Sequence, residues 1–149
     1  PKVTERMHTK NQSINIEKLS IGDELPRRSF CPDSKQLFLY NASLWNAHRI
    51  HFDYPYAKEV EGYPELVLAG PLLGDWIHQC LEEWLGTNGR IKSVDYSNRI
   101  ASYLGETLFS GGSITAIDLE TREIILEVFI KNAKDEIVSP GTAAVEFTS

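Results

Sequence analysis

The stretch PLLGDWIHQCLEEWLG, residues 71–86, decides the fold. Its apolar side chains recur at offsets of three, four, seven and eight residues and form one wide stripe along a helix. Pro71 suits the first helical position, and Gly86 suits the left-handed conformation just past a helix end. The spacing therefore predicts a helix over residues 71–85, packed against something large and flat. Gly74 inside that helix predicts a close approach to a strand, because glycine otherwise costs a helix about 1 kcal/mol.

The C-terminal half of the chain supplies the strands for such a surface. Four segments alternate or run apolar with many β-branched residues: IKSVDYSNRIA (91–101), GSITAIDL (112–119), EIILEVFIK (123–131) and TAAVEFT (142–148). The stretches between them are short, among them a turn expected at Gly111-Gly112, and such connections imply antiparallel hairpins. The predicted fold class is α+β, with an antiparallel sheet wrapped around one long helix.

Upstream of the helix the pattern is shorter and more aromatic. QLFLYNAS, residues 36–43, predicts a buried strand. Asp53 precedes Tyr54 and Pro55 and suits the N-cap of a further helical turn. Residues 1–13 are polar, and we expect them to form a flexible tail ahead of a single domain over residues 14–149.

The composition of the 149-residue chain excludes several classes of protein. Apolar residues make up 42% and charged residues 24%, the balance of a soluble globular domain rather than of a disordered chain. The net charge of −6 with no basic run argues against a nucleic-acid partner. The longest apolar stretch is the eight residues 66–73, whereas a membrane span needs about 20, so we expect no membrane association.

The two cysteines, Cys31 and Cys80, are too few for a disulfide framework and lack the spacing of a metal site. We expect two reduced thiols. With no apolar signal segment in the N-terminal residues, the predicted compartment is the cytoplasm, with the mitochondrial matrix as an alternative.

Two features could carry chemistry. Asn46, His48 and His51 place an amide and two imidazoles within six residues, and histidine exchanges protons near neutral pH. Surface or capping histidines are the alternative, as is a metal site, which lacks a third ligand nearby. The second feature is Gly70, whose backbone N–H opens the long helix and suits an oxyanion or a polarised carbonyl; a plain helix start is the alternative.

The run LWNAHRIHFDYPYAKEVEGYPELVLAGPLL, residues 44–73, resembles the MaoC-like hot-dog family of (R)-specific enoyl-thioester hydratases and dehydratases. Asn46 and His51 match the family's spacing of an acidic or amide residue five positions before a histidine. Asn at this position is typical of the branch with hydroxyacyl-thioester dehydratases and mesaconyl-type hydratases. The later YLGETLFSGGSITAID also resembles the family's strand after the helix. The chain departs from many members at Ala69, where they carry histidine.

The resemblance implies a single hot-dog fold that pairs with a second copy or a paralogue. It also implies reversible hydration of a trans-2-enoyl thioester to an (R)-3-hydroxyacyl thioester. In that reaction His51 would be the base, Asn46 would hold the water, and the Gly70 N–H would bind the carbonyl. No metal, flavin or nicotinamide is implied, and no motif for one is present.

The substrate would be an acyl-CoA or acyl-carrier-protein thioester, whose phosphates need cations. The sequence offers five candidates without a choice among them: Arg49, Lys58, Arg90, Lys92 and Arg99. Two rival functions remain open, a hot-dog thioesterase using Asp75 and a non-catalytic subunit of a hetero-oligomeric hydratase.

Overall fold

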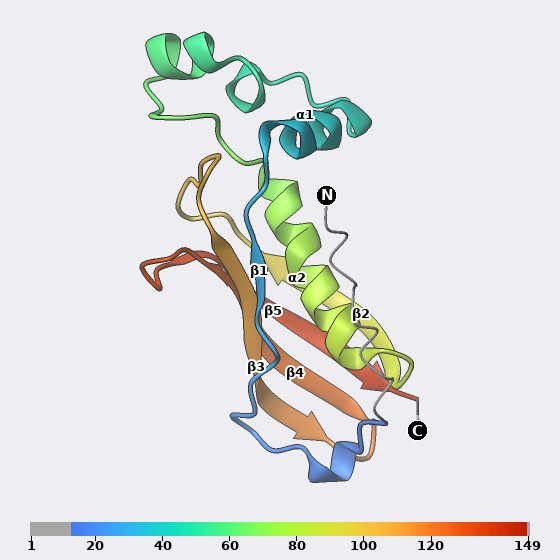
Figure 1. The fold of residues 1–149 in the computed structure, drawn as a ribbon. Coiled ribbons are helices and arrows are strands. Elements are labelled where there is room, and N and C mark those ends of the chain that lie inside the picture. Colours follow the sequence, from blue (N-terminus) through green and yellow to red (C-terminus); the bar gives the residue numbers. More distant parts are fainter. Residues whose placement is uncertain (1–12, 149) are drawn as a thin grey trace, which may run out of the picture.

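The computed structural model of the chain describes residues 13–148, in which five antiparallel strands form one sheet with the order β1-β3-β4-β5-β2. The helix α2 (Gly70–Leu85) lies along one face of this sheet, as Figure 1 shows, and the predicted wrapping of sheet around helix is confirmed. The strands are β1 (Arg28–Phe30), β2 (Gly89–Tyr96), β3 (Leu108–Asp118), β4 (Glu123–Lys131) and β5 (Ile137–Phe147). None of the helices in the described range has the length and apolar character to span a membrane.

The α2 helix has the ends and the buried face that its sequence predicts. Proline occupies its first turn, and Gly86 has a φ of 55° at its C-terminal end, where its N–H donates to the Glu82 carbonyl. Trp76 is 2% exposed and stacks on Phe30 of β1 with ring centroids 4.3 Å apart. Burying a large apolar side chain stabilises the fold by about 1.5–3 kcal/mol. The buried face of α2 therefore contributes much of the stability of the packing between helix and sheet. Its buried members are Leu72, Leu73, Trp76, Ile77, Cys80, Leu81 and Leu85.

Gly74 lies in close contact with a residue of β2, as predicted. A Cβ built on Gly74 would lie 2.2 Å from the hydroxyl oxygen of Tyr96. Only the absence of a side chain lets this ring lie across the second turn of α2.

The strand predicted over residues 36–43 is wrong, because this segment belongs to the helix α1 (Ser34–Ser43). Asp33 caps this helix by accepting a hydrogen bond from the Gln36 N–H at 2.8 Å. Leu37 and Asn41 are buried, whereas Phe38 is 55% exposed. Burial four residues apart fits a helix, and the apolar run misled the prediction because much of it faces outward.

The turn predicted at Gly111-Gly112 is also wrong, since both glycines lie inside β3. A Cβ on Gly112 would meet the Glu127 carbonyl oxygen at 2.5 Å, and one on Gly111 would meet the Phe129 ring at 2.8 Å. Glycine marks a close approach of neighbouring groups here rather than a turn. The predicted strand 91–101 ends at Tyr96, and the one predicted over 142–148 begins at Ile137. The long strand β3 follows the loop after β2 and is the second strand after the α2 helix.

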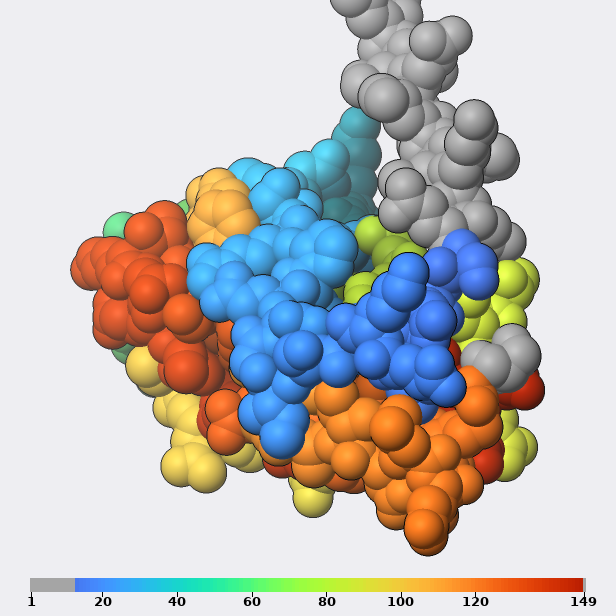
Figure 2. All heavy atoms as spheres, turned by 90° about the horizontal axis from the view of Figure 1, so that it is seen from below, coloured from blue at the N-terminus to red at the C-terminus, as the bar shows by residue number. Residues whose placement is uncertain are grey.

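The N-terminal segment pairs with β3 along one edge of the sheet. In Figure 2 the blue segment that includes β1 lies against the orange of β3. The Leu25 N–H donates to the Gly112 carbonyl at 2.9 Å, which holds this segment in place. It also contains the short 3-10 helix η1 (Ile16–Lys18). Apart from Ser13, the tail predicted over residues 1–13 lies outside the described residues.

The segment between α1 and α2 gathers at the end of the molecule where α2 begins (Figure 1). It contains the 3-10 helix η2 (Arg49–His51) and the π-helical turn η3 (Tyr56–Val60). The predicted capping role of Asp53 is confirmed, since its Oδ1 accepts a hydrogen bond from the Tyr56 N–H at 3.2 Å. Asn46 and His51 both lie in this segment, which directly precedes Gly70 at the start of α2.

Candidate active site

His51 is fixed to the strand-like segment that leads into α2. Its Nδ1 lies 2.7 Å from the Val67 carbonyl oxygen, and the Val67 N–H donates to the Ile50 carbonyl at 3.0 Å. The two bonds join η2 to a residue three positions before Gly70. The neighbouring Leu68 N–H donates to the Ser102 carbonyl at 2.8 Å. The segment that leads into α2 is therefore also held by the loop between β2 and β3.

The contact with Val67 determines which nitrogen of His51 can act as a base. A carbonyl oxygen only accepts, so Nδ1 carries the proton and Nε2 keeps its lone pair. The side chain is 8% exposed, and this burial lowers its pKa below the ordinary value of 6.5. The Val67 carbonyl opposes this shift, and the nearby His48 adds to it. His51 is therefore a neutral imidazole at neutral pH, the form that can take a proton from water.

Asn46 lies in the loop between α1 and η2. Its N–H donates to the Asn41 carbonyl at 2.9 Å, and its Oδ1 accepts from the His48 N–H at 3.2 Å. Oδ1 is engaged within the loop, and no acceptor within residues 13–148 takes the hydrogens of the Nδ2 amide. No direct hydrogen bond joins Asn46 to His51 in that range, so a water would be the link between them.

Gly70 is the first residue of α2, and Ala69 before it is extended, with φ −66° and ψ 130°. No side chain caps this end of the helix. Pro71 has no N–H to donate, and the Leu72 N–H is already bonded to the Ala69 carbonyl at 3.0 Å. The Gly70 N–H is thus an available donor at the positive end of a 16-residue helix dipole.

A largely apolar groove of about 400 Å³ opens beside Asn46, a feature that sequence reasoning missed. Its one buried polar side chain is Asn41, whose Nδ2 donates to the Leu37 carbonyl at 2.8 Å while its Oδ1 has no partner. Recognising the groove requires the helical assignment of α1, which the sequence pattern did not give. The groove is lined by Phe38, Asn41, Ala42, Trp45, Asn46, Ala47 and Phe52.

The five predicted cations do not come together in the single chain. Arg49 pairs with Asp53 at 2.7 Å and lies 4.1 Å from the Tyr56 ring centroid, so it stabilises the loop. Arg90 pairs with Glu146 at 2.6 Å, and Lys92 pairs with Glu123. Both lie on the part of β2 near the C-terminal end of α2, whereas His51 lies at the other end.

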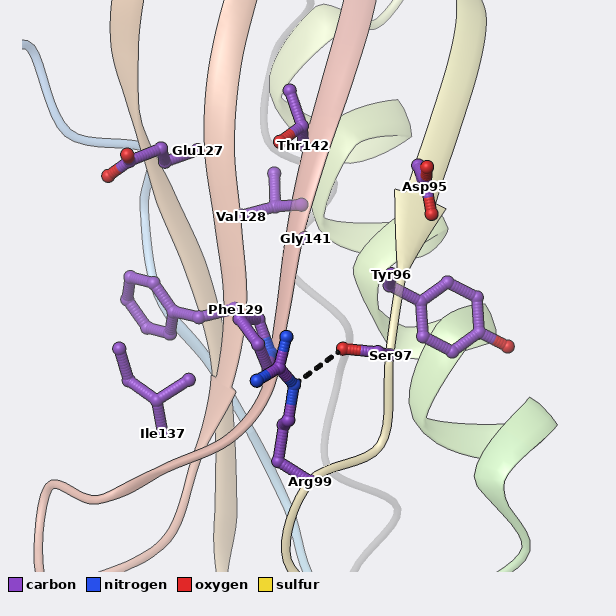
Figure 3. Close-up of a pocket in the computed structure, with 11 residues that line it drawn as sticks. Asp95, Tyr96, Ser97, Arg99, Glu127, Val128, Phe129, Ile137, Gly141 and Thr142 are labelled. Atoms are coloured by element: carbon purple, nitrogen blue, oxygen red, sulfur yellow. Dashed lines mark hydrogen bonds between the residues drawn. The ribbon is translucent and has the colours of Figure 1, made fainter.

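Lys58 and Arg99 have no carboxylate partner within residues 13–148. Lys58 donates to the Tyr54 hydroxyl at 3.4 Å, and the Arg99 Nε donates to Ser97 Oγ at 3.0 Å. Figure 3 shows Arg99 lining an outer pocket of about 480 Å³ on the sheet, while Tyr96 points toward α2.

The metal alternative finds no ligand set in the described part of the chain, where no three His, Cys, Asp or Glu side chains are placed to hold an ion. The rings of His48 and His51 lie 5.9 Å apart and tilted. His48 instead caps η2, as its Nδ1 accepts from the Ile50 N–H at 3.4 Å. Cys31 is exposed and Cys80 is buried, both as free thiols.

A curved antiparallel sheet around one long helix defines the hot-dog class. The (R)-hydratase from A. caviae involved in PHA biosynthesis has this fold, with a TM-score of 0.80 over 88% of this chain and 98% of that one. At 17% identity the likeness establishes the fold alone. The family model for hydroxyacyl-thioester dehydratase type 2 matches residues 3–104, and the chain belongs to that family.

Two named relatives match part of this chain. The mesaconyl-C(4)-CoA hydratase of Chloroflexus aurantiacus is 54% identical over 46 residues, 31% of this chain. The mitochondrial hydroxyacyl-thioester dehydratase type 2 of Schizosaccharomyces pombe is 42% identical over 64 residues, 42% of this chain. The aligned segments span 16% and 21% of those two proteins.

Proposed function

We propose that this chain is the catalytic hot-dog unit of a hydro-lyase that interconverts a trans-2-enoyl thioester and an (R)-3-hydroxyacyl thioester. The observation that carries the proposal is the bond from His51 Nδ1 to the Val67 carbonyl. It leaves Nε2 as a neutral base and ties His51 to Val67, the residue three positions before the free N–H that opens α2. Membership of the dehydratase family and the names of the two relatives support the same reaction.

The proposed reaction needs a base, a held water and a stabilised enolate. Asn46 holds the water through Nδ2, and His51 Nε2 takes one proton from it as its oxygen bonds to C3. The electron pair of the double bond moves onto the thioester, and the Gly70 N–H binds the negative oxygen. The imidazolium then gives its proton to C2 on the same face, which completes a syn addition. General acid–base help contributes about 10²–10⁴-fold, and one oxyanion donor contributes about 10²–10³-fold.

One assay separates this function from its two rivals. Hydration removes the ultraviolet absorbance of the conjugated thioester without releasing a thiol, thioester hydrolysis releases the thiol, and a non-catalytic subunit does neither. We expect loss of absorbance alone. Thiol release at a comparable rate would contradict the proposal.

The thioesterase alternative would use Asp75 as its base or nucleophile. The Oδ2 of Asp75 accepts a hydrogen bond from the Tyr40 hydroxyl at 2.7 Å. Burial, together with this bond, raises the pKa of Tyr40, and the bond occupies one carboxylate oxygen in joining α1 to α2. Asp75 therefore has a structural role that a nucleophile would have to give up.

Asn46→Asp tests whether Asn46 holds the water. A carboxylate here cannot donate as Nδ2 does, but it can hold the water by accepting a hydrogen bond from it, and its charge favours protonated His51 and raises the histidine pKa. We expect activity within about tenfold of wild type and an acidic limb of the pH–rate profile that moves to higher pH. Asn46→Leu, which is similar in size but cannot hydrogen-bond, should lose far more. A tolerated leucine with an unmoved profile for aspartate would exclude the water-holding role.

We propose further that two hot-dog units pair, as a homodimer or with a paralogue. The strand β2 bonds only to β5, which leaves an open sheet edge, and such edges are usually covered. Phe38 is 55%, Leu39 65% and Trp45 94% exposed around α1, an apolar surface that a monomer rarely leaves in water. Light scattering should give about twice 16.8 kDa at micromolar concentration. A mass of one chain would contradict the pairing.

The substrate carrier and the compartment also belong to the proposal. An acyl-CoA or acyl-carrier-protein thioester brings phosphates. Of the five candidate cations, Lys58 and Arg99 are the two without a carboxylate partner in residues 13–148. The compartment is proposed as the cytoplasm or the mitochondrial matrix, the latter in line with the name of the S. pombe relative.

A further inference from the structure

Asn98, which follows β2, places its side-chain amide directly beside Gly70. A Cβ built on Gly70 would lie 2.3 Å from Asn98 Nδ2, 3.2 Å from its Cγ and 3.8 Å from its Oδ1. The amide nitrogen is therefore the part of Asn98 nearest to the start of α2. A glycine at position 70 is what leaves room for it there.

The orientation of this amide is set by a buried hydroxyl. Ser139 on β5 is 0% exposed, and its Oγ donates to Asn98 Oδ1 at 2.7 Å. Because Oδ1 accepts this bond, the two hydrogens of Nδ2 are turned to the Gly70 side. No acceptor in residues 13–148 takes them. Asn98 itself is exposed in the single chain, so a substrate can reach its amide.

We propose that Asn98 is a second oxyanion donor, whose Nδ2 binds the same thioester oxygen as the Gly70 N–H. Ser139 acts through Asn98 and is a positioning residue. This inference rests on the proposed hydration reaction and extends it to a residue outside the Asn46–His51 segment. Charge builds on the thioester oxygen as water adds to C3, and hydrogen bonds to an ionised acceptor are about twice as strong as neutral ones. Two donors that are fixed in place before the reaction stabilise the enolate more strongly than they stabilise the bound substrate, and this difference lowers the barrier.

Asn98→Ala and Asn98→Asp separate the donor from a structural role. Asn98→Asp keeps an acceptor for Ser139 but replaces the donor with a negative oxygen beside the enolate. We expect Asn98→Ala to lower kcat about 10²-fold with little change in KM, and Asn98→Asp to lower it further. Ser139→Ala should lower kcat less. Ser93→Ala, an exposed serine on β2, is the matched control and should leave kcat unchanged. Aspartate at wild-type kcat would overturn the proposal.

A spectroscopic measurement keeps this test independent of turnover. In a His51→Ala background, an enoyl thioester labelled with 13C at its carbonyl should bind without reacting. We expect its carbonyl stretching band to shift to lower frequency on binding, and Asn98→Ala in that background to reverse part of the shift. An unchanged band on removal of Asn98 would overturn the donor role even if wild type hydrates the substrate. A shift that depends on Asn98 in a protein without hydratase activity would instead refute the proposed function alone.

Discussion

His51→Ala is expected to fold normally and to lose at least about a hundredfold in hydration rate, the low end for loss of a general base. The Nε2 lone pair is the proposed acceptor of the water proton, and residues 13–148 offer no second imidazole in its place. His48 is exposed and caps η2, with its ring centroid 5.9 Å from that of His51. Turnover should be followed by the absorbance of the conjugated thioester.

Two controls belong with this variant. His51→Gln can keep a side-chain N–H donor for the Val67 carbonyl yet cannot take a proton, so it should be as inactive as alanine. His48→Ala removes the other imidazole of the same turn and should stay near wild type. In wild type the acidic limb of kcat/KM should lie below pH 6.5, because burial lowers the pKa of His51. Near wild-type turnover in His51→Ala would exclude it as the base.

Gly70→Pro should lose at least about a hundredfold in kcat relative to Gly70→Ala. Both variants add the Cβ that meets Asn98, but only proline removes the N–H that is proposed to bind the enolate oxygen. Proline is tolerated in the first turn of a helix, and Ala69 already has the extended conformation, ψ 130°, that a following proline requires. Circular dichroism should therefore show both variants folded.

The alanine variant carries its own information. Its Cβ would displace the Asn98 amide, so kcat should already fall below wild type before the N–H is lost. Equal rates for the alanine and proline variants would show that the Gly70 N–H does not bind the reacting carbonyl.

The fold could be predicted where one face of an element is buried. The apolar side chains of α2 and the alternating side chains of β4 pack against the core on one face of each element. Their spacing in the sequence therefore predicts a helix and a strand. The α1 segment predicts a strand instead of a helix because Phe38 and Leu39 are apolar but exposed. An apolar run that includes exposed side chains shows no clear helical spacing. Gly111 and Gly112 predict a turn because turns favour glycine. A strand that lies close to a neighbouring ring or carbonyl group also requires glycine, and that is the case in β3.

The site could be predicted only in part. His51 and Gly70 were predicted from a short motif and a helix start, and the structure places both at the same end of α2. The tether from His51 to Val67 spans 16 positions and the bond from Asn98 to Ser139 spans 41, so neither leaves a local pattern. The carrier cations could not be narrowed to fewer because the partners of Arg90 and Lys92, Glu146 and Glu123, lie on other strands and are distant in the sequence.

The most direct test of the proposed reaction is incubation of the wild-type protein with a trans-2-enoyl thioester in 18O-labelled water, followed by mass spectrometry and chiral analysis. The account predicts one labelled oxygen bonded to C3 of an intact thioester, with R configuration, and at most about a hundredth as much in the same time with His51→Ala. Label found in the carboxyl group of a released acid, or no label at C3 with the wild-type protein, would contradict it.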